Sequence, residues 1–272
     1  MTYRWLVTDL DGTLVDRRLR MVPRSREALR RFRAGGGEVV IATGRSRESA
    51  APYYAELNLT GPAILLNGAL ICDLSTGEVL LDRRLPAPVW AAATELLDAL
   101  DGDAAGVAFR GGQAFRVVTS PLIDAYAARD RVTVEAVGDW SDLPPTEVSK
   151  AMIVCASTAV AERVTEKAAA LDVTVVVSEP TYVELLPSGV DKGTALTWLT
   201  GHWGVPLDQV AAVGDNPNDI PMLRVAGLGA AVGDGHPAVR AAADVVVGGC
   251  DDGAVADVIA QILDGAERGV LS

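Results

Sequence analysis

The first 82 residues alternate between short apolar runs and amphipathic stretches, and this order leaves few folds open. The apolar runs have the length and composition of buried strands, and each ends in a polar or glycine-containing turn. The stretches between them have the apolar spacing of helices. Alternation of this kind predicts a parallel sheet covered by helices. The expected strands are residues 4–10, 38–45 and 62–69, and the expected helices are residues 25–36 and 46–58.

The pattern changes after about residue 82 and returns at about residue 187. The middle block mixes three helical stretches with apolar runs, two of which flank Gly111 and Gly112 and predict a hairpin. We therefore predict an α/β protein with a Rossmann-like, doubly wound parallel sheet. Residues 1–82 and 187–272 are expected to form the core, and residues 83–186 an inserted α+β cap domain.

Polar side chains follow several of the predicted core strands. Asp9 and Asp11 end the first strand, Thr43 and Gly44 end the second, and Asp215 ends the run VAAVGD. Lys192 opens the helix that precedes this last strand. Ligands of open parallel sheets bind beyond the carboxyl ends of the strands, so these residues are expected to gather at one edge of the sheet.

Asp9 and Asp11 lie close together, and like charges at this spacing are costly unless a positive group lies between them. A Mg²⁺ ion held by Asp9 and Asp215 would supply that charge. With the ion in place, a carboxylate can attack phosphorus and form an aspartyl-phosphate. Asp11 would then protonate the leaving oxygen and deprotonate the attacking water.

The remaining polar groups suit an anionic phosphoryl group. Lys192 can hold a phosphate oxygen as a compact cation. Thr43 can donate its hydroxyl, and the backbone N–H groups of Leu10 and Gly44 can point into the same concavity. These residues predict a phosphate site beside the metal site.

Four segments in this order resemble the motifs of the haloacid dehalogenase superfamily: DLDGT, ATGR, DKG and GDNPNDIPM. Together with LLNGA and VGDGHPAVRAAADVV, they resemble its Cof-type phosphatases, which carry a subclass IIB cap. The resemblance implies that Asp9 is the nucleophile and a metal ligand, and that Asp11 is the acid/base, with its backbone carbonyl on Mg²⁺. It also implies that Asp215 binds the metal, Asp219 supports the metal's water shell and Asn218 contacts phosphate.

Composition excludes other classes of function. The formal net charge of −12 and the lack of a basic tract argue against nucleic acid as a partner. Two histidines cannot build a histidine-rich metal site. No apolar run reaches the roughly 20 residues that a membrane span needs. The first residues do not resemble a signal peptide, and three widely spaced cysteines favour a reducing compartment, so a cytoplasmic location is expected.

The sequence thus predicts a Mg²⁺-dependent phosphomonoester hydrolase that acts on a small phosphorylated metabolite, such as a sugar phosphate. Two alternatives stay open: a phosphomutase that uses the same aspartyl-phosphate, and a non-catalytic metabolite-binding regulator. Selectivity is expected to come from the cap, with Arg110, Arg116 and Glu184 as candidate substrate contacts. Monomer and dimer both remain possible.

Overall fold

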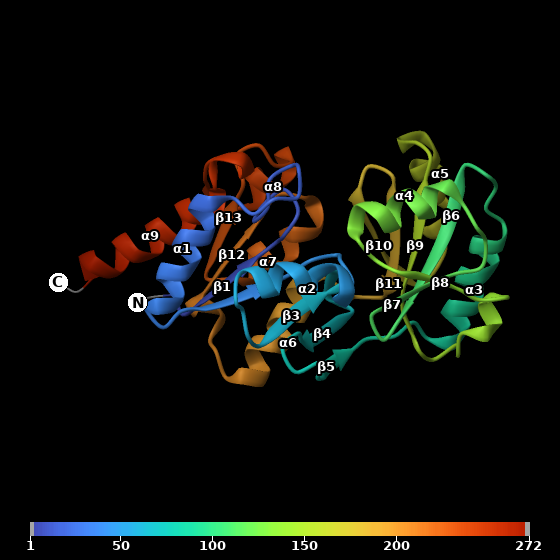
Figure 1. Ribbon diagram of the computed structural model, residues 1–272, viewed down its shortest axis with the longest axis horizontal. Coiled ribbons are helices and arrows are strands. Elements are labelled where there is room, and N and C mark those ends of the chain that lie inside the picture. Colours follow the sequence, from blue (N-terminus) through green and yellow to red (C-terminus); the bar gives the residue numbers. More distant parts are fainter. Residues whose placement is uncertain (1–2, 270–272) are drawn as a thin grey trace.

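The computed structural model describes residues 3–269, and it describes the side chains up to residue 264. The chain forms a core and a separate cap, which lie side by side in Figure 1. Helix α9 closes the chain on the core, beside α1. The expected α/β fold with an inserted α+β domain is confirmed.

The core contains a parallel sheet with the strand order β14-β13-β12-β1-β2. A further bridge between Ala42 and Ile64 places β3 alongside β2. Thr8 of β1 lies opposite Ile41 of β2 and Val213 of β12, so these three strands end at the same level. The strands are β1 (Trp5–Thr8), β2 (Glu38–Ile41), β3 (Pro62–Leu65), β12 (Val210–Gly214), β13 (Leu228–Ala231) and β14 (Val245–Val246).

Helices cover both faces of this sheet, because its strands are apolar on both sides. Leu6 belongs to a cluster with residues of α1 and α9, whereas Val7 belongs to a cluster with residues of α6, α7 and α8. This alternation is that of a strand with a period of two. The helices are α1 (Pro23–Ala34), α2 (Arg47–Glu56), α6 (Lys192–Trp203), α7 (Ile220–Val225), α8 (Pro237–Ala242) and α9 (Ala254–Gly269).

The segment after β2 differs from its prediction. Residues 62–69 were expected to form one strand, but β3 ends at Leu65, and the next two residues, Leu66 and Asn67, have positive φ angles of 50° and 55°. This turn reverses the chain into β4 (Leu70–Asp73) and β5 (Val79–Asp82), which form an antiparallel three-stranded sheet with β3. An apolar run alone cannot show such a reversal.

The cap is built on a six-stranded sheet with the order β10-β11-β9-β6-β7-β8, in which only the β7–β8 pair is parallel. The expected hairpin is confirmed, since β6 pairs with β7 around Gly111 and Gly112, both at positive φ. The strands are β6 (Ala104–Arg110), β7 (Gln113–Arg116), β8 (Val134–Ala136), β9 (Val148–Cys155), β10 (Val173–Glu179) and β11 (Tyr182–Pro187).

The two faces of the cap sheet have different neighbours. Ala151 and Ile153 of β9 cluster with α3 (Ala87–Asp98) and α5 (Thr158–Ala168), whereas Met152 and Val154 belong to the cluster that contains α4 (Pro121–Asp130) and core residues. Short 3₁₀ turns complete the described chain at Leu66–Gly68, Trp140–Asp142, Leu207–Gln209, Pro217–Asp219 and Cys250–Asp252. Within residues 3–269, no helix combines the length and apolarity that crossing a membrane requires.

Gly68 brings the turn after β3 against the start of α6, and this close approach yields a prediction. A Cβ atom at Gly68 would lie 2.3 Å from the carbonyl oxygen of Asp191, and φ is +101°. At Gly36, φ is also positive (+86°), but a Cβ would meet nothing within 4 Å.

We expect Gly36→Ala to lower the free energy of unfolding by about 1–2 kcal/mol, because alanine is strained at positive φ but meets no neighbouring atom there. Gly68→Ala adds a clash with backbone and is expected to cost clearly more. Denaturant melts of both variants measure the difference. Equal losses would show that the turn and α6 are not held in this close contact.

Candidate active site

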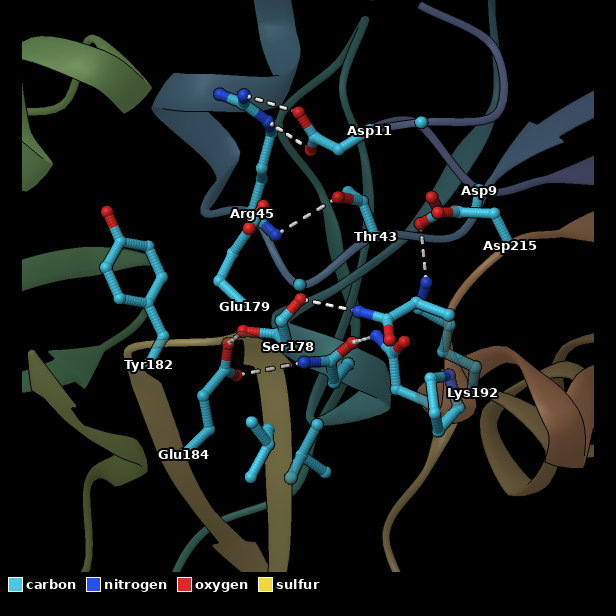
Figure 2. A pocket seen from close by; sticks show the side chains of 18 of the residues that line it. Asp9, Asp11, Thr43, Arg45, Ser178, Glu179, Tyr182, Glu184, Lys192 and Asp215 are labelled. Atoms are coloured by element: carbon cyan, nitrogen blue, oxygen red, sulfur yellow. Dashed lines mark hydrogen bonds and ion pairs between the residues drawn. The ribbon is translucent and has the colours of Figure 1, made fainter. Parts of the chain in front are cut away.

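A cavity of about 770 Å³ lies between the core and the cap (Figure 2). The core contributes Asp9, Asp11, Thr43, Lys192 and Asp215, which all follow strand ends or open a helix. The expected convergence at the carboxyl edge of the sheet is therefore present. The backbone N–H of Asp9 donates to the carbonyl of Val213 at 2.9 Å, so the chain after β1 stays beside the end of β12.

Lys192 is fully buried and bridges two carboxylates. Its Nζ donates to Asp9 Oδ1 and to Asp219 Oδ1, both at 2.6 Å. Burial alone would lower the pKa of Lys192, but the charges of Asp219 and Asp9 outweigh it and raise the pKa above its usual value. The side chain is thus a fixed cation beside Asp9. Lys192 is the first residue of α6. The Asp191 side chain caps this helix by accepting a hydrogen bond from the backbone N–H of Thr194.

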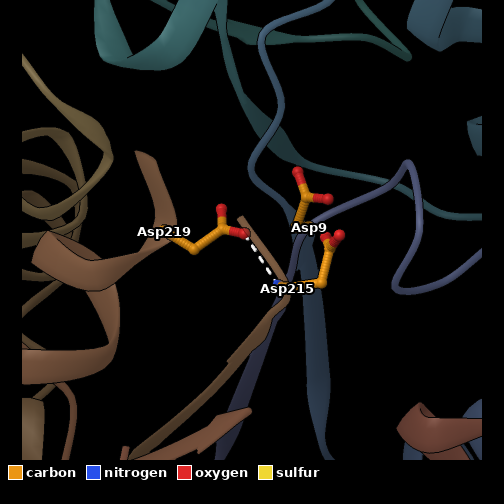
Figure 3. Close-up of side chains that lie close together, drawn as sticks. All are labelled: Asp9, Asp215 and Asp219. Atoms are coloured by element: carbon orange, nitrogen blue, oxygen red, sulfur yellow. Dashed lines mark hydrogen bonds between the residues drawn. The ribbon is translucent and has the colours of Figure 1, made fainter. Parts of the chain in front are cut away.

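Three carboxylates come together around this cation: Asp9, Asp215 and Asp219 each offer an oxygen within 4.8 Å of the others (Figure 3). Asp219 already uses both oxygens, since Oδ2 accepts the backbone N–H groups of Asp215 and Asn216 at 2.9 and 3.0 Å. Asp215 Oδ1 accepts from the Thr13 hydroxyl at 2.9 Å. Asp9 and Asp215 are therefore the carboxylates with oxygens left for a ligand.

The cluster holds more negative charge than Lys192 can balance. Burial raises the pKa of Asp9 well above its usual range, and the neighbouring carboxylates raise it further against the opposing effect of Lys192. Burial, followed by the charge of Asp219, raises the pKa of Asp215 to about 7. Converging carboxylates with excess negative charge are the donors that a hard cation such as Mg²⁺ prefers, so the residues present fit such an ion.

Gly12 makes room for this arrangement. It has φ +75°, and a Cβ atom there would lie 2.7 Å from Asp215 Oδ2. Gly12 is thus required both by the positive φ of the backbone turn and by the close approach of the Asp215 carboxylate.

Asp11 is held by Arg45, a residue for which the sequence predicted no role. Arg45 Nε and Nη2 donate to the two oxygens of Asp11 at 2.7 and 2.8 Å, and the guanidinium is buried (Figure 2). Arg45 Nη1 also donates to Ser49 Oγ at 2.6 Å. Burial alone would lower the pKa of Arg45, but the bidentate contact with Asp11 outweighs it and raises the pKa.

Arg45 also reaches the cap. Its Nη2 lies 3.9 Å from the carboxylate of Asp130, which is itself buried at the end of α4. Burial raises the pKa of Asp130, with Arg45 acting in the opposite direction. The sequence offered one signal for Arg45, its place in ATGR directly after Thr43 and Gly44, but nothing local points to a partner 34 residues away.

Of the expected phosphate-binding residues, Thr43, Gly44, Lys192 and Asn218 line the cavity, whereas Leu10 does not. The Thr43 hydroxyl accepts the backbone N–H of Arg45 at 3.2 Å, and a Cβ on Gly44 would come within 2.9 Å of the Asn67 side chain. Asn218 Nδ2 donates to Asn67 Oδ1 at 2.9 Å. The Leu10 side chain is fully buried in the core, so this residue can offer only its backbone to the site.

Of the three candidate substrate contacts in the cap, only Glu184 lines the cavity. Arg110 instead forms an ion pair with Glu147 at 3.8 Å and lies over the Phe115 ring. Arg116 donates to the Val118 carbonyl and the Thr119 hydroxyl, so both arginines are engaged elsewhere in the cap. The cap wall of the cavity contains other residues that the sequence did not suggest: Tyr126, Arg129, Asp130, Lys150, Ser178, Glu179 and Tyr182.

Comparison with known proteins gives a consistent result. Residues 6–259 match the family described as haloacid dehalogenase-like hydrolase. The chain is 30% identical over 271 residues to the pyridoxal phosphate phosphatase YbhA of Escherichia coli, which covers 91% of this chain and 94% of that protein. It is also 27% identical to the chloroplastic endoribonuclease YBEY of Arabidopsis thaliana over 94% of its own length, but it spans only 46% of that protein.

Solved structures show the same architecture. A haloacid dehalogenase-like hydrolase from Bacteroides thetaiotaomicron superimposes with a TM-score of 0.83 at 28% identity, over 96% of this chain and 99% of the other. The subclass IIB sugar phosphatase BT4131 superimposes with a TM-score of 0.83 over 95% and 98% of the two chains. At 22% identity, this second likeness concerns the fold alone.

The acidic cluster predicts a response to Mg²⁺ that can be measured without an activity assay. An ion that binds only the folded protein stabilises it by about 2.7 kcal/mol at a concentration 100 times its Kd, which raises Tm by several degrees. We expect such a rise for the unaltered chain. Asp215→Asn should abolish most of it, because a neutral amide is a poor ligand for Mg²⁺.

Asp172→Asn, an exposed substitution of the same kind in the cap, is the matched control and should keep the full rise. Without Mg²⁺, Asp215→Asn is not expected to melt lower, since it removes one charge from a crowded acidic cluster. If Asp215→Asn kept the full rise, the ion would have to bind somewhere else.

Proposed function

The chain belongs to the haloacid dehalogenase-like hydrolases and is a phosphatase of that type; from this premise we propose that it hydrolyses phosphomonoesters of small metabolites with Mg²⁺, through an aspartyl-phosphate on Asp9. The observation that carries the proposal is the buried Asp9–Lys192 pair at the cavity, with Asp11 two residues further along. The sequence motifs of the chain are those of a Cof-type phosphatase with a subclass IIB cap.

Asp9 is the proposed nucleophile. Lys192 holds the Asp9 carboxylate through Oδ1, and one oxygen of this carboxylate attacks phosphorus. A bond forms between this oxygen and phosphorus, and the bond from phosphorus to the leaving oxygen breaks. The same lysine can hold a phosphate oxygen through its remaining N–H, so one cation would orient both reactants.

Asp11 is the proposed acid/base. In the first step it gives its proton to the leaving oxygen. In the second it takes a proton from the water that attacks phosphorus, and the bond from phosphorus to the Asp9 oxygen breaks, which releases inorganic phosphate and the free carboxylate. Arg45 holds both carboxylate oxygens of Asp11, so it fixes the position of this carboxyl group for both steps.

Asp9 and Asp215 would hold Mg²⁺, together with the backbone carbonyl of Asp11, and Asp219 would support its water ligands. When bound, the ion supplies positive charge that screens the attacking carboxylate from the anionic phosphoryl group. The phosphate oxygens would be contacted by five groups: the Thr43 hydroxyl, the backbone N–H groups of Leu10 and Gly44, the Lys192 ammonium and the Asn218 amide.

The substrate is proposed to be a small phosphorylated metabolite such as a sugar phosphate. The cavity is closed on one side by cap residues, among which Arg129 lies over the Tyr182 ring and pairs with Glu179. Charged and aromatic side chains of this kind suit a hydroxyl-bearing or ring-shaped leaving group. The resemblance to a relative named pyridoxal phosphate phosphatase supports this class of substrate. The three cysteines are free and buried, which supports a cytoplasmic location.

A phosphate-release screen over phosphorylated sugars, polyols, cofactors and nucleotides, with Mg²⁺ or with a chelator, tests the proposal. Release of inorganic phosphate that requires Mg²⁺ is the expected result. Conversion of a sugar phosphate into its isomer without release would instead identify a phosphomutase. Tight binding of a metabolite without turnover would identify a regulator, and either outcome would overturn the proposal.

The nucleophile assignment predicts the effect of Asp9→Asn. The amide nearly preserves the shape of the side chain but cannot form the aspartyl-phosphate, so we expect kcat to fall by about 10³-fold or more. Asp264→Asn, an exposed change on α9, should leave kcat within about twofold. A folded Asp9→Asn variant with substantial turnover, measured on freshly prepared protein, would rule out Asp9 as the nucleophile.

The Arg45–Asp11 clamp predicts an effect that depends on the leaving group. Lysine cannot reproduce the bidentate contact, so Arg45→Lys is expected to lower kcat/KM for an alkyl phosphate by about 10- to 100-fold. For p-nitrophenyl phosphate the loss should be smaller, because its leaving group needs little protonation.

Arg47→Lys is the control, since Arg47 lies two residues along but does not line the cavity. It should change kcat/KM little for either substrate. A loss from Arg45→Lys that is equal for both leaving groups would mean that Arg45 does not act through Asp11.

A further inference from the structure

The cap contains a buried ion pair that the proposed chemistry leaves unused. Lys150 of β9 and Glu184 of β11 are 2.8 Å apart, and their side chains are only 2% and 3% exposed. Both lie on the sheet face that is directed toward α4 and the core, and Lys150 Nζ lies 4.5 Å from the centre of the Phe109 ring. Buried charges are costly, so their further contacts indicate what they hold in place.

Lys150 reaches across to the core and contacts the loop that carries Thr43. Its Nζ donates to the backbone carbonyl of Gly44 at 3.0 Å. The N–H of the same peptide group, that of Arg45, donates to Thr43 Oγ1 at 3.2 Å (Figure 2). Lys150 and Thr43 thus hold opposite ends of one peptide group. Because Thr43 Oγ1 accepts this bond, its own hydrogen stays available for a phosphate oxygen.

Glu184 reaches the core by a second route. Its Oε2 accepts from Asn67 Nδ2 at 2.9 Å, and Asn67 Oδ1 in turn accepts from Asn218 Nδ2 at 2.9 Å. Asn67 lies in the left-handed turn after β3, and its backbone N–H donates to the carbonyl of Thr43 at 3.0 Å. Ser178 of β10 donates to Glu184 Oε1, so the carboxylate is fully engaged.

We propose that the Lys150–Glu184 pair of the cap positions the phosphate-binding groups of the core, so that the phosphate site is complete only when the cap is seated. The inference rests on the proposed function, since it assigns Thr43, Gly44 and Asn218 to phosphate. Lys150 and Glu184 are positioning residues in this account: they act through the Gly44 peptide and the Asn67 amide. The cap then serves the group that all substrates share, as well as the leaving group.

The test measures the affinity of inorganic phosphate, which has no leaving group for the cap to recognise. Calorimetry and competitive inhibition give this affinity for the full chain with Mg²⁺. We expect Lys150→Met to weaken phosphate binding by roughly tenfold, the loss typical of one misplaced hydrogen bond to a charged group. Arg110→Met, which breaks a partly exposed cap ion pair outside the cavity, is the control and should have no effect.

Stability must be separated from positioning, because Lys150→Met leaves Glu184 buried without its partner. The double variant Lys150→Met with Glu184→Leu replaces the pair with apolar side chains, which often restores stability. We expect it to recover the Tm lost in Lys150→Met but not the phosphate affinity. Recovery of both would overturn the inference, since the pair would then serve stability alone.

A coupling measurement tests the route through Thr43. If Lys150 acts through the Thr43 hydroxyl, Thr43→Val combined with Lys150→Met should weaken phosphate binding hardly more than Thr43→Val alone. Additive losses would contradict the route, as would a loss in Lys150→Met that affects the KM of organic substrates and not phosphate itself. If the unaltered chain bound no phosphate, the proposed function would fail. Normal phosphate binding by the Lys150→Met, Glu184→Leu variant would refute this inference alone.

Discussion

The buried ammonium of Lys192 is the interaction on which the rest of the site depends. It lies between Asp9 and Asp219 in a cluster that would otherwise be wholly acidic, and its position is fixed by the start of α6. One lysine cannot neutralise three carboxylates, so the cluster retains the charge that attracts a divalent cation. The parallel sheet makes this possible, because β1 and β12 end at the same level and place Asp9 and Asp215 side by side.

The cap is joined to this chemistry through two cations with different partners. Arg45 belongs to the core but lies between Asp11 and the buried Asp130 of the cap. Lys150 belongs to the cap but donates to the core carbonyl of Gly44. The acid/base and the phosphate loop are therefore each connected to the position of the cap. A domain that only covered the cavity would need neither contact.

The sequence predicted the parts of the site that follow from strand order, because a residue at a strand end has its place set by the sheet. Asp9, Asp215 and Thr43 are of this kind. It missed Arg45 and Lys150, whose acidic partners lie 34 residues away or further and leave no local periodicity. The choice of Arg110 and Arg116 rested on charge alone, and local partners in the cap hold both side chains away from the cavity. The turn at Leu66–Gly68 was missed because an apolar run does not show where the backbone adopts positive φ.

The measurement that tests the account most directly is the capture of the phosphorylated enzyme. Protein mixed rapidly with substrate and Mg²⁺ is quenched during turnover, reduced with borohydride and mapped by mass spectrometry. The account predicts a phosphoryl group on one residue, Asp9, which reduction converts to homoserine, at a level that follows the pre-steady-state release of the alcohol. A phosphoryl group on another residue, or none while phosphate is being released, would contradict it.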